Sequence, residues 1–178
     1  MPPISLWPRR ARGIHKHFDH AGNQKPMPII FLDFDGVLHP ADEGEKALMA
    51  ENGSSPQIFT WAESLASLIN DFPAVRVIIH SAWRNVFPLE DLKALLPAAL
   101  ASRVCATTQP GLPRWDSIEL YLNDQEAKHR CKCQFIIIDD EPCEFPASHP
   151  SLIVCNPALG MSEKSTMAAI HDWLRSLP

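Results

Sequence analysis

The sequence lacks long apolar runs and paired cysteine motifs. No segment approaches the roughly 18 consecutive apolar residues that a membrane-spanning helix needs, and the first residues lack the apolar core of a secretory signal. The five cysteines, an odd number, include no C-x-x-C pair of the kind that holds structural zinc. These absences exclude an integral membrane protein and a disulfide-stapled secreted domain, so we expect a soluble, cytoplasmic protein without a membrane partner.

The cysteines are expected to be free thiols, because buried cysteines usually behave as small apolar residues. Cys131 and Cys133 lie two residues apart, which leaves a metal-binding role for this pair as an alternative. The five positions are Cys105, Cys131, Cys133, Cys143 and Cys155.

Charge is distributed unevenly along the chain. The formal net charge is −5, yet residues 1–27 carry several arginines and lysines against Asp19 alone. We expect this head to be a solvated N-terminal tail. A targeting segment and a contact for a polyanion such as nucleic acid are the alternatives. Residues 28–178 are long enough for one domain with one core.

Short apolar runs alternate with helical stripes through that domain. The expected strands are 29–32, 75–79, 102–106, 135–138 and 151–155. The expected helices are 59–72, 89–100 with an interruption at Pro97, 114–129, and one that begins at Ser162; residues 39–57 form a loop with a short helical piece. This alternation predicts right-handed crossovers and a parallel sheet covered on both faces, an α/β, Rossmann-like, three-layer α/β/α sandwich.

Polar side chains stand where three of the expected strands end. They are Asp33 and Asp35 after the first strand, Ser81 and Arg84 after the second, and Asp139 and Asp140 after the fourth. Because binding sites of open α/β sheets form at the carboxyl ends of the strands, these residues predict one common site.

The residue types suit phosphate chemistry. The carboxylate of Asp33 can attack phosphorus and form an acyl-phosphate, and Asp35 can protonate the leaving oxygen and later deprotonate the attacking water. Gly36 allows the chain to turn away closely behind the acids. Mg²⁺, which prefers oxygen ligands, can be held by Asp33, Asp35 and either Asp139 or Asp140.

The same pattern resembles the haloacid dehalogenase (HAD) superfamily. Its first motif, D-x-D-G-x-[LV] after an apolar strand, is matched by residues 33–38; its second, a strand ending in Ser or Thr, by Ser81; and its fourth, a strand ending in paired acids, by Asp139-Asp140. The third motif is a basic residue near the start of the helix before the last of these strands, where Arg114 stands. The resemblance implies that Ser81 and Arg114 bind the phosphoryl group, with Arg84 as the alternative cation, and that Asp35 reaches the metal through its backbone carbonyl.

A narrower resemblance covers roughly residues 29–175. The motifs around Asp33, Ser81-Ala82-Trp83-Arg84, Arg114 and Asp139 are similar to the small HAD-like domain attached to RNA repair enzymes. The chain departs from that subgroup at Met161, where a Gly-Leu-Thr-like stretch is usual. Residues 39–74 and 85–113 leave little room for a cap domain, so the resemblance implies an open site that suits a large phosphorylated substrate such as a nucleic-acid end.

Several alternatives remain open. The substrate of such a phosphatase could instead be a small metabolite, the reaction could be a phosphotransfer, or the domain could be a lapsed HAD-like binding module. Asp35 disfavours a dehalogenase, and an acid pair after the fourth strand disfavours a receiver domain. Between the paired acids, Asp139 is favoured as the direct metal ligand. His80 and Trp61 are expected to be core or rim residues and Glu141 a solvated turn residue; the oligomeric state is not predicted.

Overall fold

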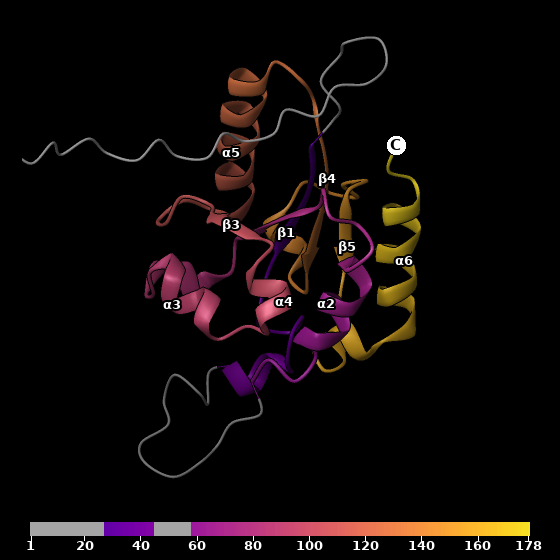
Figure 1. The fold of residues 1–178 in the computed structure, drawn as a ribbon. Helices are drawn as coiled ribbons and strands as arrows, with labels where there is room; N and C mark the ends of the chain where they lie inside the picture. The colour runs from indigo at the N-terminus through magenta and orange to yellow at the C-terminus, as the bar shows by residue number, and fades with distance from the viewer. Residues whose placement is uncertain (1–26, 45–57) are drawn as a thin grey trace, which may run out of the picture.

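The computed structural model describes residues 27–44 and 58–178. Five strands form one sheet in the order β3-β2-β1-β4-β5, and every neighbouring pair is parallel. The strands are β1 (Met27–Leu32), β2 (Arg76–Ile79), β3 (Val104–Thr107), β4 (Cys133–Asp139) and β5 (Leu152–Val154) (Figure 1). The predicted α/β fold with a parallel central sheet is therefore confirmed.

Helices connect these strands and mostly follow the predicted stripes. They are α2 (Ala62–Ile69), α3 (Leu89–Ala94), α4 (Ala98–Ala101), α5 (Arg114–His129) and α6 (Lys164–Arg175), with short 3₁₀ turns η1 (Ala82–Asn85), η2 (Pro142–Glu144) and η3 (Gly160–Ser162). The bounds predicted for α5 are confirmed. The stretch 89–100 is two helices, because Pro97 lacks the N–H that a continuous helix would use.

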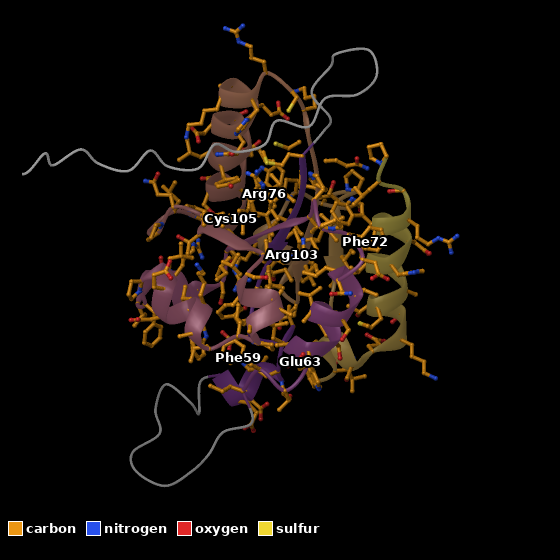
Figure 2. All side chains as sticks on the ribbon, viewed as in Figure 1. Phe59, Glu63, Phe72, Arg76, Arg103 and Cys105 are labelled. Carbon is orange, nitrogen blue, oxygen red and sulfur yellow. The ribbon has the colours of Figure 1, made fainter. Side chains whose placement is uncertain are left out.

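The helix predicted to begin at Phe59 begins three residues later, so that prediction was wrong at its start. Phe59 has a φ of 58°, in the left-handed region, which a helix cannot continue through. Phe59 lies near the lower end of the molecule in Figure 2, the end toward which β1 runs. Its unusual backbone matters for the site described below.

The sheet is covered on both faces, because successive residues of a strand point to opposite sides. Ile30 and Leu32 of β1 pack into a large cluster with buried residues of α2, α3, α4 and α6. Ile29 and Phe31 pack on the other face against Ile118 of α5 and its neighbours. This alternation produces the predicted three layers.

The order of the strands brings the predicted site residues together. The central strand β1 pairs with β2 on one side and β4 on the other. The ladder continues past the strand ends, since His80 donates its N–H to the Leu32 carbonyl and Asp33 donates its N–H to the Ile138 carbonyl. The residues after β1, β2 and β4 therefore stand side by side at one edge of the sheet.

Arg103 supports the sheet away from that edge. Its guanidinium donates to backbone carbonyls at and just beyond the carboxyl end of α2, those of Ile69, Asn70, Phe72 and Pro73, and Figure 2 labels it together with Phe72. Two of these carbonyls, those of Ile69 and Phe72, also accept the backbone N–H groups of Phe72 and Val75. Arg103 thus ties the start of β3 to the end of α2.

The remaining predictions concern the cysteines, membrane-spanning helices and the segments on either side of β1. All five cysteines are free thiols, as predicted. In residues 27–44 and 58–178, no helix combines the length and the apolar character that crossing a bilayer requires. The helical piece predicted within 39–57 is seen at 41–44, whereas residues 45–57 and the basic head up to residue 26 lie outside the described residues. The tail and the domain boundary stay predictions.

Candidate active site

Asp33 stands at the carboxyl end of β1 with its side chain 1% exposed. Its Oδ1 accepts the N–H of Phe34 at 2.8 Å, and the Ser81 hydroxyl, which follows β2, also hydrogen-bonds to the carboxylate. Burial raises the pKa of Asp33 above its usual value, while Arg114 and these hydrogen bonds oppose the rise. The carboxylate is consequently held in one orientation by donors from two strand ends.

Arg114, the first residue of α5, bridges the acids of two strands. Its Nη1 lies 2.6 Å from Asp33 Oδ2 and 2.5 Å from Asp139 Oδ2, and its Nη2 lies 2.9 Å from Glu141 Oε2. Burial and the helix dipole both disfavour a cation at this helix start, yet the carboxylates of Asp33 and Asp139 raise the pKa of Arg114. Arg114 is therefore a fixed positive charge beside the predicted nucleophile.

Three carboxylates gather at this edge. Oxygens of Asp33, Asp139 and Asp140 lie within 4.8 Å of one another; within the described residues, this is the group suited to a metal ion. Burial, followed by repulsion from Asp33, raises the pKa of Asp139 to about 7. The same two causes, with Glu141 next, raise the pKa of Asp140 to about 6.

Such a group fits a hard divalent cation. Carboxylate oxygens are the ligands that Mg²⁺ prefers, and after burial, repulsion from Asp33 is the next cause of the raised pKa values of Asp139 and Asp140. No metal group among the described residues includes Cys131 or Cys133.

Gly36 makes the approach of Asp140 possible. The φ of Gly36 is 66°, and a Cβ added there would lie 2.2 Å from Asp140 Oδ2. A side chain at this position would therefore face both backbone strain and a collision. The prediction that Gly36 lets the chain turn closely behind the acids is confirmed.

Arg84 lies at the same edge with its guanidinium turned to the backbone. Its Nη1 donates to the carbonyls of His80 and Ser81, and its Nη2 donates to the Leu112 carbonyl at 3.3 Å. The residue is 5% exposed. Arg84 thus joins the loop after β2 to the loop that precedes Arg114, whereas Arg114 itself contacts the carboxylates.

Asp35 has a different environment from the buried acids. Its side chain is 29% exposed and lies outside the metal-type group of Asp33, Asp139 and Asp140. His39 Nε2 lies 3.0 Å from one carboxylate oxygen, and the indole Nε1 of Trp83 donates to the other at 2.8 Å. The predicted general acid is therefore held by two nitrogen donors.

His39, Trp83 and Glu141 are site residues that sequence reasoning missed. In retrospect, both His39 and Trp83 lie close in sequence to predicted site residues: His39 follows Asp35 by four residues, and Trp83 follows Ser81 by two. Glu141 is exposed as expected, but it pairs with Arg114 rather than being only a solvated turn residue.

His80 and Trp61 are core or rim residues, as predicted. His80 is buried, and burial, then Arg114 and Arg84, lower its pKa well below the usual value, so it is neutral. Its Nε2 lies 3.4 Å from Asp139 Oδ2. Trp61 is partly buried and packs against the larger core cluster.

Comparison with protein families agrees with this geometry. Residues 29–166, more than half of the chain, match the family described as the HAD domain in Swiss Army Knife RNA repair proteins. The searches of curated proteins and of solved structures find no match. The matched range contains every acid of the site, Ser81 and Arg114. The chain therefore belongs to the HAD domain family of Swiss Army Knife RNA repair proteins.

Proposed function

We propose that this protein is a Mg²⁺-dependent phosphomonoester phosphatase that works through an aspartyl-phosphate on Asp33. The observation that carries the proposal is the buried carboxylate of Asp33 at the end of β1, within 4.8 Å of Asp139 and Asp140 and bonded to Arg114. A nucleophile, oxygen ligands for a cation and a fixed positive charge are what transfer of a phosphoryl group requires.

In the first step an oxygen of Asp33 forms a bond to phosphorus while the bond from phosphorus to the leaving oxygen breaks. Asp35 gives its proton to that leaving oxygen. In the second step Asp35 takes a proton from water, the water oxygen bonds to phosphorus, and the bond to Asp33 breaks. Inorganic phosphate leaves, and both aspartates return to their starting forms.

Side chains around Asp33 would bind the phosphoryl oxygens. The Ser81 hydroxyl, which bonds to Asp33, can donate to one of them, and Arg114 can stabilise the charge that builds up in the transition state. Since Arg84 donates to three carbonyls, we assign the catalytic cation to Arg114 and give Arg84 the task of holding the Arg114 loop.

The metal would be held by Asp33, the Asp35 backbone carbonyl and one of the paired acids; when bound it offsets the repulsion between nucleophile and phosphate. We favour Asp140 over Asp139 as the direct ligand. Asp139 already accepts from the Glu141 N–H and from Arg114. The Asp140 carboxylate accepts from its own backbone N–H and, among the described residues, has no ion pair with an arginine.

The nucleophile is tested with an aryl phosphate. We expect hydrolysis that depends on Mg²⁺ and that falls at least about 1,000-fold in Asp33→Asn. Asp172→Asn, an exposed aspartate of α6, is the matched control and should retain full activity. Beryllofluoride, which mimics an acyl-phosphate, should bind the wild type and not Asp33→Asn. Equal rates in wild type and Asp33→Asn would end the proposal.

The acid is tested by varying the leaving group. An alkyl phosphate needs its leaving oxygen protonated far more than an aryl phosphate does, so Asp35→Asn should lose about 100-fold or more with the alkyl substrate and much less with the aryl one. Comparable losses with both substrates would remove Asp35 from the role of general acid.

We further propose that the substrate is a phosphorylated RNA end. The family description supports this, as do the short connections expected to leave the site open. The value of kcat/KM for 3′- and 5′-phosphorylated oligonucleotides should exceed that for the matching mononucleotides at equal Mg²⁺ and salt. A preference for mononucleotides would favour a small-metabolite phosphatase.

A further inference from the structure

We propose that His39 and Trp83 are positioning residues that hold the Asp35 carboxylate in the orientation needed for proton transfer; the inference rests on the proposed function. His39 Nε2 lies 3.0 Å from Asp35 Oδ1, and Trp83 Nε1 donates to Asp35 Oδ2 at 2.8 Å. One donor on each oxygen prevents free rotation of the carboxylate. We call these three side chains the Asp35 clamp.

The tautomer of His39 follows from its second contact. The backbone N–H of Phe59 donates to His39 Nδ1 at 3.3 Å, and an N–H can donate only to a ring nitrogen that carries no hydrogen. The ring hydrogen is therefore on Nε2, which faces Asp35. Because His39 is completely buried, it cannot exchange this partner for solvent.

Aromatic packing keeps the clamp rigid. The Phe59 ring lies edge-to-face against His39, Trp83 and Phe34, with centroid separations of 5.1, 5.7 and 5.0 Å. Phe59 also adopts a φ of 58°, which is costly for a bulky residue. Strain of this kind persists only where the surroundings fix the residue, so the left-handed backbone at Phe59 is maintained by the contacts that also orient His39.

A third side of Asp35 is closed by backbone. A Cβ added to Gly44 would lie 1.6 Å from Asp35 Oδ1 and 3.0 Å from His39 Nε2. No residue larger than glycine fits there without displacing the carboxylate. Since the Asp35 side chain is still 29% exposed, one side remains open, and that is where a leaving oxygen can approach.

Loss of a clamp residue should slow hydrolysis most for substrates whose leaving group depends most on protonation by Asp35. A misplaced general acid hardly slows departure of an aryl group, which leaves without a proton, but it slows departure of an alkyl group. A purely structural role for His39 and Trp83 would slow both substrates alike.

The test compares alkyl and aryl phosphates in full-length variants. Trp83→Phe keeps an aromatic ring and removes the donor, and His39→Phe does the same at the other oxygen. Each should lose about 10- to 100-fold in kcat with the alkyl phosphate and less than about 3-fold with the aryl phosphate. His39→Gln, whose amide can donate in place of Nε2, should recover part of the alkyl activity. Phe87→Leu is the control, because Phe87 packs on Trp83 at 5.7 Å and has no polar side-chain atom.

A second readout does not depend on activity. The indole N–H signal of Trp83 can be assigned in a ¹H–¹⁵N spectrum by its absence from Trp83→Phe. Asp35→Ala should shift this signal more than those of the other four tryptophans, and Asp172→Asn should not shift it.

The outcomes separate the two proposals. If the wild type hydrolyses neither phosphate, the proposed function fails and the inference fails with it. If the wild type hydrolyses both, but Trp83→Phe and His39→Phe lose the same factor on both, the positioning role alone is overturned. A Trp83 indole signal that ignores Asp35→Ala would overturn it as well, even where a variant folds too poorly for kinetics.

Discussion

The two aspartates of the first motif stand two residues apart and have opposite surroundings. Asp33 is buried and is balanced by charge, since Arg114 contacts it directly and also contacts Asp139. Asp35 is 29% exposed and is held by the uncharged N–H groups of His39 and Trp83.

In the proposed mechanism, this difference would allow one motif to supply two kinds of chemistry. A nucleophile must be ionised and aimed at phosphorus, which favours fixed cations around it. A general acid must gain and lose a proton, which favours neutral donors and an open side. We call Asp33, Asp139, Asp140 and Arg114 the charged half of the site and the Asp35 clamp the neutral half. Activity should be sensitive to changes of charge in the charged half and to changes of geometry in the Asp35 clamp.

Among changes to the surroundings of the two aspartates, the largest effect is expected from removing the charge at Arg114. In Arg114→Met, Asp33 and Asp139 would remain buried together without a cation, so a proton would be taken up and the ionised nucleophile depleted. We expect kcat/KM to fall about 100- to 1,000-fold. Arg114→Lys keeps the charge but cannot bridge both acids and Glu141, so it should lose clearly less. A Met variant as active as the wild type would show that the charged half does not need this cation.

Substituting two glycines, one beside Asp140 and one beside Asp35, should disturb the charged half and the Asp35 clamp separately. Gly36→Ala should collide with Asp140 and raise the Mg²⁺ concentration for half-maximal activity about 10-fold, whereas Gly44→Ala should collide with Asp35 and lower kcat for an alkyl phosphate by about 10-fold. Gly111→Ala is the control, because Gly111 has a φ of 78° and nothing within 4 Å of an added Cβ. Identical phenotypes for the two variants would mean that the halves are not independent.

A smaller effect concerns stability after EDTA treatment. The pKa of Asp139 is raised from 3.8 to about 7, so the folded protein binds a proton that the unfolded chain has released. Its contribution to stability is thus complete below about pH 4 and is lost as the pH rises through about 7. Asp139→Asn has no titrating carboxyl at this position and therefore does not lose this contribution. We expect the difference in Tm, wild type minus Asp139→Asn, to fall by several degrees as the pH rises from 5 to 8.

Neutral His80 contributes the opposite trend below about pH 6.5. Because its Nε2 lies 3.4 Å from Asp139 Oδ2, this trend differs between the two proteins, so the Tm difference is most informative above about pH 6.5. Saturating Mg²⁺ should reduce the slope, since the cation favours the ionised acid. A difference in Tm that does not change with pH would contradict the raised pKa of Asp139.

The smallest effect on activity is expected far from the site. Arg103→Met removes the donor to the carbonyls at the end of α2 and should lower the free energy of unfolding by about 1–2 kcal/mol. The value of kcat/KM should stay within a factor of two of the wild type. Reduced kcat/KM in a folded Arg103→Met would show that the sheet transmits changes from the β3 end to the acids.

Much of the fold could be predicted from local pattern. The apolar strands, the stripe of α5 and the acids that follow β1 and β4 are properties of neighbouring residues, and a parallel sheet with the site at its carboxyl edge follows from their alternation. Helix starts were less predictable. Phe59 belongs to an apolar stripe by spacing, and only its packing on His39, Trp83 and Phe34 explains why it stays outside α2.

The sequence by itself predicted which polar residues gather at the site: Asp33 and Asp35 after one strand, Ser81 after another, and Asp139 and Asp140 at the end of a third, because each follows an apolar run. Only the tertiary structure decided what each of them touches. Arg114 and Arg84 are both basic residues near strand ends, and their partners, carboxylates for one and carbonyls for the other, depend on where α5 begins relative to the sheet. His39 and Trp83 meet Asp35 from separate segments of the chain, and contacts made across such separations are set by packing rather than by any local pattern.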